Sequence, residues 1–295
     1  MKVVTLIENG KLDIPDITAE HGISLYIESN DKKILFDLGH KDTFYKNAKI
    51  LNIDIGEVDY VIISHGHFDH AGGLKCFLEN NKKARIIMKK SALEKHFVGV
   101  FGLKFNCGLD KELVNKNIQR FILLEDDYEL DEDMKIITNI EKKYPLATTN
   151  NNIYKLSEGK KIRDDFNHEL IFAVKENNKI IAFPGCGHSG ILNIVETIKG
   201  YYGDNNKINI ISGFHLKNPV GRKNSESDEK LSSIANTLAK DSCIEKIYTG
   251  HCTGERAYSI FKEMLGDKIE EFHTGQVINF DAERINNERN FKGYS

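Results

Sequence analysis

The sequence of 295 residues contains no tryptophan, four prolines and five cysteines. Few prolines, together with 40% hydrophobic and 29% charged residues, exclude a proline-rich disordered chain and indicate an ordinary folded protein. The cysteines are odd in number and scattered, which argues against a disulfide framework and favours a reducing, cytoplasmic location.

Long apolar runs and a strong excess of one charge are also lacking. No stretch approaches the about 20 apolar residues of a membrane helix, and the N-terminal run becomes polar at residues 8–10, unlike a signal peptide. A formal net charge of −3 gives no general attraction for nucleic acid or an anionic membrane. We therefore expect a small-molecule substrate, with phosphorylated compounds included; the oligomeric state stays open.

Short apolar runs bounded by turn residues predict strands at residues 3–7, 23–27, 33–36, 58–63, 84–88, 121–124, 135–140, 170–174, 180–183, 208–211, 244–248 and 277–280. Helical spacing predicts helices at 71–78, 191–198, 231–238 and 257–265. Early strands followed by strand–helix alternation predict one α/β domain over residues 1–295, with stacked sheets and outer helices.

Two stretches are less regular. Residues 91–117 are expected to form helical pieces broken by glycines, and residues 148–163 a polar surface excursion. We treat residues 91–165 as a candidate insertion or lid. Residues 282–295 form a polar tail.

The most informative segment follows the apolar run at 58–63. Three histidines and one aspartate fall within six residues there, as His65, His67, Asp69 and His70. Imidazole and carboxylate groups suit zinc, iron or manganese. Because His65 and His67 can project to one side while Asp69 and His70 face a second ion, the spacing predicts a two-metal site.

A metal site also needs ligands from other parts of the chain. Candidate side chains follow three later strands in glycine-containing turns, namely Cys186 with His188, then His215, then His251. If these strands are parallel, their carboxyl ends meet at one edge of the sheet, where α/β proteins place their sites.

The pattern H-x-H-x-D-H resembles the signature of the metallo-β-lactamase superfamily, and the resemblance spans nearly the whole chain. Asp37, within Leu-Phe-Asp-Leu-Gly, resembles the first motif of this superfamily. The later segments around Cys186, His215 and His251 are similar to a subgroup of archaeal dihydropterin–ribofuranosylaminobenzene phosphate synthases and uncharacterised bacterial relatives. The resemblance implies an αββα sandwich of two mixed sheets covered by outer helices.

The resemblance also implies a ligand set. His65, His67 and His188 would hold a first metal, and Asp69, His70 and His251 a second. The superfamily usually has a bridging aspartate after a glycine, but here Cys186 follows the glycine. A thiolate is a soft ligand that favours zinc. We therefore expect two zinc ions, with manganese or iron as alternatives.

The positions of Asp37, Asp69 and His215 in the sequence suggest roles other than metal binding alone. Asp37 is expected to orient a ligand imidazole rather than bind metal. Asp69 is a candidate general base toward the attacking water, and His215 a candidate catalytic or substrate-contacting residue. A basic segment after His215 could meet a phosphate, through Lys217, Arg222 and Lys223.

The remaining histidines belong to no constellation in the sequence and are expected to be structural or surface residues: His21, His40 (which is near enough to Asp37 to approach the site), His96, His168 and His273. The other cysteines are expected to be small packing residues: Cys76, Cys107, Cys243 and Cys252. Candidate linings for a flat aromatic substrate are Phe68, Phe97, Phe101, Phe105 and Phe214.

The simplest functional hypothesis is a metal-dependent hydrolase of an ester, lactone, thioester or phosphoester. The subgroup resemblance instead implies a transferase that joins a pterin diphosphate to an aryl amine. A non-catalytic, metal-dependent binding module is a third alternative, because the usual Gly-Asp motif is absent. Nucleic-acid processing is disfavoured by the lack of a basic appendage. An oxygen-reducing diiron centre is disfavoured because position 67 is histidine instead of glutamate and no flavin domain is attached.

Overall fold

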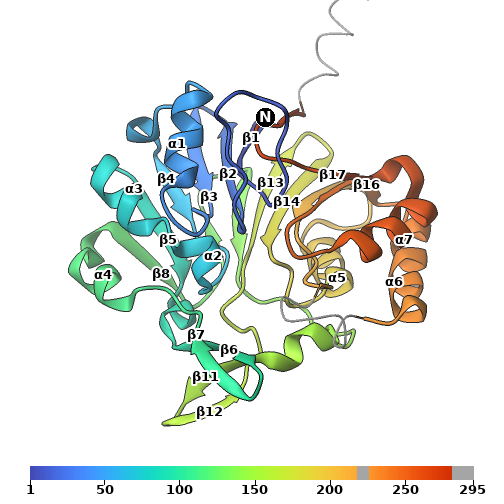
Figure 1. The fold of residues 1–295 in the computed structure, drawn as a ribbon. Helices are drawn as coiled ribbons and strands as arrows, with labels where there is room; N and C mark the ends of the chain where they lie inside the picture. Colours follow the sequence, from blue (N-terminus) through green and yellow to red (C-terminus); the bar gives the residue numbers. More distant parts are fainter. Residues whose placement is uncertain (218–225, 281–295) are drawn as a thin grey trace, which may run out of the picture.

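The computed structural model describes residues 1–217 and 226–280, and two mixed sheets of seven strands face each other at its centre (Figure 1). The first sheet has the order β18 (Val277–Asn279), β1 (Lys2–Ile7), β2 (Ser24–Ser29), β3 (Lys32–Phe36), β4 (Tyr60–Ile62), β5 (Arg85–Lys89) and β8 (Phe121–Leu124). The second has the order β17 (Ile269–Glu271), β16 (Ile244–Thr249), β15 (Lys207–Ser212), β14 (Lys179–Gly185), β13 (Ile171–Glu176), β10 (Met134–Ile137) and β9 (Tyr128–Glu129).

The central core lies between these sheets. Phe36 of β3 packs against Phe172 and Phe183 of the second sheet, with ring centroids 6.5 and 5.7 Å apart, and all three side chains are fully buried. Burying such a side chain contributes about 1.5–3 kcal/mol, which makes this layer a main source of stability. Alternate residues of the same strands point outward into two further apolar clusters.

Helices cover both outer faces. The first sheet is covered by α1 (Thr43–Ile50), α3 (Leu74–Asn80) and α4 (Lys111–Lys116), and the second by α5 (Ile191–Tyr202), α6 (Asp228–Lys240) and α7 (Glu255–Leu265). The predicted αββα sandwich is therefore confirmed. Short 3₁₀ turns occur at η1 (Ile55–Glu57), η2 (Lys90–Leu93), η3 (Ile118–Arg120), η4 (Thr148–Asn152) and η6 (Gly266–Lys268). Within the described ranges, no helix is both long and apolar enough to cross a membrane.

A third sheet was not predicted. Its order is β12 (Lys160–Arg163), β11 (Ile153–Ser157), β6 (His96–Val100) and β7 (Leu103–Asn106), and it lies at the bottom of Figure 1. The expectation of helical pieces is wrong for residues 96–106, because Phe101 and Gly102 both have positive φ and form a two-residue hairpin turn. The polar stretch at 148–163, expected as a surface excursion, contains the strands β11 and β12, which were not predicted, and β11 pairs with β6.

The predicted helix at 71–78 is divided into α2 (Phe68–Ala71) and α3. At Gly72 and Gly73, a Cβ atom would lie 2.0 Å from the carbonyl oxygen of His40 and 2.3 Å from that of Leu38. Only glycine permits this close approach, which seats α2 against the end of β3.

Parallel pairing brings the later strand ends together, as expected. Gly185 of β14 pairs with Ser212 of β15, which pairs with Thr249 of β16. In the first sheet, β4 is parallel to β3, so the loop after β4 begins beside Asp37. The carboxyl ends of strands from both sheets thus border one region.

Candidate metal centre

A first group of donor atoms consists of His65, His67 and His188, all buried and within 4.8 Å of one another. His65 and His67 come from the loop between β4 and α2, and His188 from the loop between β14 and α5. Nε2 of His65 lies 3.1 Å from Nδ1 of His67. Two imidazoles from one sheet therefore meet a third from the other sheet.

Outer hydrogen bonds fix the direction of these rings. Nδ1 of His65 lies 2.8 Å from Oγ of Ser64, which donates its own proton to Asp37. Nδ1 of His188 lies 3.0 Å from Oδ1 of Asn150, in η4. Because Nδ1 donates in both cases, each Nε2 keeps a lone pair for a metal ion.

The protonation states suit metal binding as well. Burial, followed by the neighbouring imidazoles, holds the pKa of His65, His67 and His188 well below the usual histidine value. The neutral imidazole that results is the form that coordinates metals.

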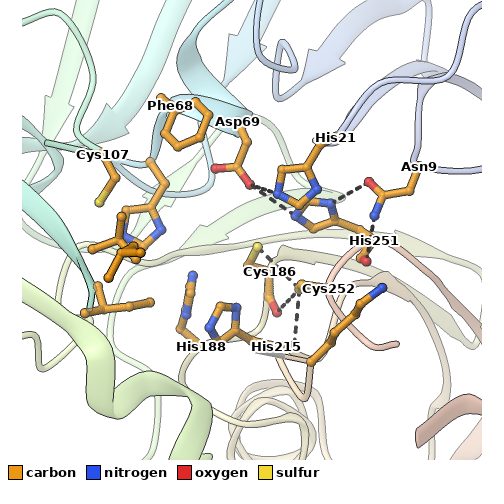
Figure 2. Close-up of a pocket in the computed structure, with 15 residues that line it drawn as sticks. Asn9, His21, Phe68, Asp69, Cys107, Cys186, His188, His215, His251 and Cys252 are labelled. Atoms are coloured by element: carbon orange, nitrogen blue, oxygen red, sulfur yellow. Dashed lines mark hydrogen bonds and ion pairs between the residues drawn. The ribbon is translucent and has the colours of Figure 1, made fainter. Parts of the chain in front are cut away.

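A second group consists of Asp69, His70, Cys186 and His251, whose donor atoms also lie within 4.8 Å of one another. Oδ2 of Asp69 is 3.4 Å from Nε2 of His251 and 3.8 Å from Nε2 of His70. Nε2 of His70 is 3.0 Å from Sγ of Cys186. Figure 2 shows Asp69 and His251 turned toward each other above Cys186. This group also combines residues from both sheets.

Asp37 orients His70 of the second group through a hydrogen bond. Its Oδ2 accepts from Nδ1 of His70 at 2.6 Å, and its Oδ1 accepts from the backbone N–H of Ser64 at 2.8 Å. His251 is held in the same way, because its Nδ1 lies 3.2 Å from Oδ1 of Asn9 and its backbone N–H donates to Glu8. The geometry supports the orienting role expected for Asp37.

The ionisation of Asp69 and of Cys186 in the second group depends on their neighbours. Burial raises the pKa of Asp69, but His70, His21 and His251 outweigh it and hold that pKa well below the usual value. Burial and the neighbouring Cys252 raise the pKa of the Cys186 thiol, so its ionisation needs a nearby cation. The nitrogen, oxygen and sulfur donors together fit zinc.

Two histidines at the site have a left-handed backbone conformation. His215 and His251 have φ values of 45° and 50°, conformations that cost non-glycine residues about 1–3 kcal/mol. The ring of His215 lies 4.0 Å from that of His188, and neither ring nitrogen has a hydrogen-bond partner in the described part of the chain. His215 is thus free to contact a substrate.

Cys252 has more than the packing role expected of it. Its Sγ lies 3.5 Å from Sγ of Cys186 and accepts the backbone N–H of His215 at 3.2 Å. Donor atoms of Cys186, His215 and Cys252 lie within 4.8 Å of one another. All five cysteines are free, as the sequence indicates.

Several site residues were missed in the sequence. His21 is not isolated, because its Nε2 lies 3.3 Å from Oδ2 of Asp69. His96 and His168 are buried and form a further group with His67 and Asp164. No local motif joins these positions, so only the fold brings them together. Glu169 anchors the His188 loop by accepting two backbone N–H groups, and burial raises its pKa to about 7.

A cavity of about 470 Å³ opens beside the two groups, and Figure 2 shows its lining side chains. Its volume is in the range of small-molecule sites. Val98, Val100 and Ile153 of the third sheet form an apolar wall, and Lys217 contributes a positive charge. Arg222 and Lys223 lie outside the described residues.

Of the five phenylalanines expected to line the site, Phe68 does so. Phe214 is buried in the outer core of the second sheet, and Phe97 lies beneath Lys161. Phe101 and Phe105 are 94% and 51% exposed, and neither is among the residues that line the cavity. The expectation that these four phenylalanines line an aromatic slot for a pterin is therefore wrong.

Comparisons with known proteins agree with this geometry. The family model of the metallo-β-lactamase superfamily matches residues 18–191. The 7,8-dihydropterin-6-methyl-4-(β-D-ribofuranosyl)-aminobenzene-5'-phosphate synthase of Methanocaldococcus jannaschii is 31% identical, over 95% of this chain and 97% of the synthase. An uncharacterised protein of the same organism is also 31% identical, over 88% of this chain and 93% of its own length.

Among solved structures, Tm1679, a metal-dependent hydrolase of the β-lactamase superfamily, superposes with a TM-score of 0.78 at 29% identity. The alignment covers 95% of this chain and 98% of Tm1679. The αββα layers of the described residues agree with these matches. The chain therefore belongs to the metallo-β-lactamase superfamily.

Proposed function

We propose that the chain is a hydrolase that uses two zinc ions to cleave an ester, lactone, thioester or phosphoester in a small-molecule substrate. The observation that carries this proposal is the convergence of seven buried donor side chains in two adjacent groups beside one cavity. Both the superfamily and the similarity to a metal-dependent hydrolase support it.

In this proposal, His65, His67 and His188 hold one ion, and Asp69, His70, Cys186 and His251 hold the other. When bound, such a pair of ions would lower the pKa of a water molecule to about 7 and polarise the group under attack. Asp69 has a further role, since its ionised carboxylate faces the cavity and can accept a proton from the attacking water. His215 can hold a proton at either ring nitrogen for the leaving group.

The cavity walls contribute binding and water exclusion. The apolar side chains of β6 and β11 can cover the uncharged part of a substrate. Lys217 stands at the same cavity and can bind an anionic part. We infer a substrate with an apolar body and an anionic group, such as a phosphate.

A transferase is the second candidate, because a relative with 31% identity is named as a synthase. In that case the same ligands would hold the departing diphosphate of a pterin while an aryl amine forms the new carbon–nitrogen bond. The exposed positions of Phe101 and Phe105 give this candidate less support.

Turnover assays of the zinc-loaded chain test the two candidates. We expect hydrolysis of at least one lactone, thioester or phosphoester, with loss of activity after chelation and in Asp69→Asn. Carbon–nitrogen bond formation from a pterin diphosphate and an aryl amine, without hydrolysis in the panel, would favour the transferase. A fully loaded chain with neither activity would contradict both and favour a binding module.

For Lys217→Ala, we expect KM for phosphorylated substrates to rise about 10-fold with little change in kcat. Loss of one charged hydrogen bond costs about 1.5 kcal/mol, which corresponds to this factor. Lys116→Ala is the matched control, because Lys116 lies on the exposed surface of α4. Equal KM changes for neutral and phosphorylated substrates would exclude the anion-binding role.

A further inference from the structure

One of the candidate metal-binding histidines lacks a partner for its outer nitrogen. Four of the five have such a partner at Nδ1. Nδ1 of His65 contacts Ser64, and Nδ1 of His70 contacts Asp37. Nδ1 of His188 contacts Asn150, and Nδ1 of His251 contacts Asn9. His67 directs Nδ1 toward His65, and its Nε2 is buried without a hydrogen-bond partner in residues 1–217 and 226–280. A buried donor without an acceptor costs about 1–3 kcal/mol.

A group of three further residues lies on that outer side of His67. Donor atoms of His96, Asp164 and His168 lie within 4.8 Å of one another and of a donor atom of His67. The His67 ring lies 5.6 Å from that of His96 and 5.3 Å from that of His168, both edge to face. The proposed reaction assigns no role to this group, although His96 is fully buried.

The hydrogen bonds assign the protons of this group. The backbone N–H of Gly66 donates to Nδ1 of His168 at 3.1 Å, so neutral His168 carries its proton on Nε2, 3.3 Å from Oδ2 of Asp164. The same carboxylate oxygen lies 2.8 Å from Nδ1 of His96. A carboxylate only accepts, so the proton of His96 is on Nδ1. Nε2 of His96 therefore has a lone pair, and it is buried without a partner among the described residues.

We propose that His96 is a positioning residue for His67, in which Nε2 of His96 accepts the proton on Nε2 of His67, directly or through one buried water molecule. This inference rests on the proposed metal site, because it requires Nδ1 of His67 to be the metal-facing nitrogen. Asp164 fixes the orientation of His96, and His168 connects Asp164 to Gly66. The group thus gives His67 the outer partner that the other four histidines already have.

The charge of Asp164 agrees with this role. Burial opposes its ionisation, but the imidazoles of His168 and His96, which lie 3.3 and 2.8 Å from its Oδ2, hold the pKa of Asp164 below the usual value. A third metal ion within the group is the competing arrangement. It would use Nε2 of His168 as a ligand while Nδ1 accepts from Gly66, and a neutral imidazole cannot accept at both nitrogens.

Zinc titration of the full chain against a chromophoric chelator tests the proposal. We expect His96→Leu, which removes the acceptor, to weaken one of the two zinc sites about 10- to 100-fold. His96→Gln, whose amide oxygen can accept the same proton, should retain most of the affinity. His40→Gln is the matched control, because His40 packs on Phe68 outside this group.

Two further measurements keep the proposal testable if His96→Leu does not fold. Asp164→Asn should weaken the same zinc site, because its amide can donate to Nδ1 of His96 and reverse the tautomer of that ring. Nitrogen-15 spectra of the zinc-loaded wild type should place the His67 proton on Nε2.

Equal losses in His96→Gln and His96→Leu would reduce the role to packing, and unchanged affinity in His96→Leu would overturn it. A third zinc ion that the wild-type chain binds and His96→Leu does not bind would also overturn it, since His96 would then be a ligand. A wild-type chain that binds no zinc would instead contradict the proposed function, together with this inference.

Discussion

The Cys186→Ser variant is expected to contain about one zinc ion per chain, whereas the wild type should contain about two. Sγ of Cys186 lies 3.0 Å from Nε2 of His70, within the second donor group. A thiolate is a strong zinc ligand, while a serine hydroxyl stays protonated near neutral pH and binds zinc weakly. Elemental analysis of protein purified without chelator measures the difference.

Cys252→Ser is the matched control for this variant. Its thiol is also buried and lies 3.5 Å from Sγ of Cys186, but Cys252 is not a member of the group of Asp69, His70, Cys186 and His251. We expect the control to keep two ions. Two ions in both variants would remove Cys186 from the ligand set, and a loss confined to Cys252→Ser would assign the sulfur ligand to Cys252.

For Asp37→Asn, we expect zinc affinity to fall about 10- to 100-fold and the free energy of unfolding to fall by about 1.5–3 kcal/mol. Asp37 accepts hydrogen bonds from the backbone and hydroxyl of Ser64 and from His70. Asparagine has one acceptor oxygen, so its amide group must face at least one of these donors. The φ of 58° at this position is tolerated by asparagine, which separates the hydrogen-bond effect from backbone strain.

Urea unfolding of the zinc-free and zinc-loaded chains measures both effects. Asp42→Asn is the control, because Asp42 is half exposed and pairs with Lys46 at the surface. Its free energy of unfolding should change by less than about 0.5 kcal/mol. An Asp37→Asn variant with wild-type zinc affinity would contradict the orienting role.

Much of the fold is predictable from local patterns. Strands such as β3 and β14 are short apolar runs bounded by turn residues, and α5 has apolar residues at helical spacing. His65, His67, Asp69 and His70 are close together in sequence, so the loop after β4 and the following helix α2 carry four of the candidate ligands. The parallel order of β14, β15 and β16 explains why candidate ligands after separate strands could also be predicted to lie close together.

The remaining features depend on contacts between distant segments. Asp164 and His96 are 68 positions apart, and they meet because β11 pairs with β6. The β6–β7 hairpin was mistaken for helical pieces because its turn places Phe101, rather than asparagine or glycine, at a left-handed position. Neither the register of these pairings nor the burial of the histidines has a local signal in the sequence.

The origin of the donor atoms has a consequence for folding. Each of the two proposed metal-binding groups combines residues that follow strands of the first sheet with residues that follow strands of the second. Each bound ion would therefore act as a cross-link between the amino-terminal and carboxyl-terminal halves of the chain. Because a ligand that binds only the native state stabilises it by mass action, the population of folded chain would rise with free zinc concentration, which links the persistence of the protein to metal supply.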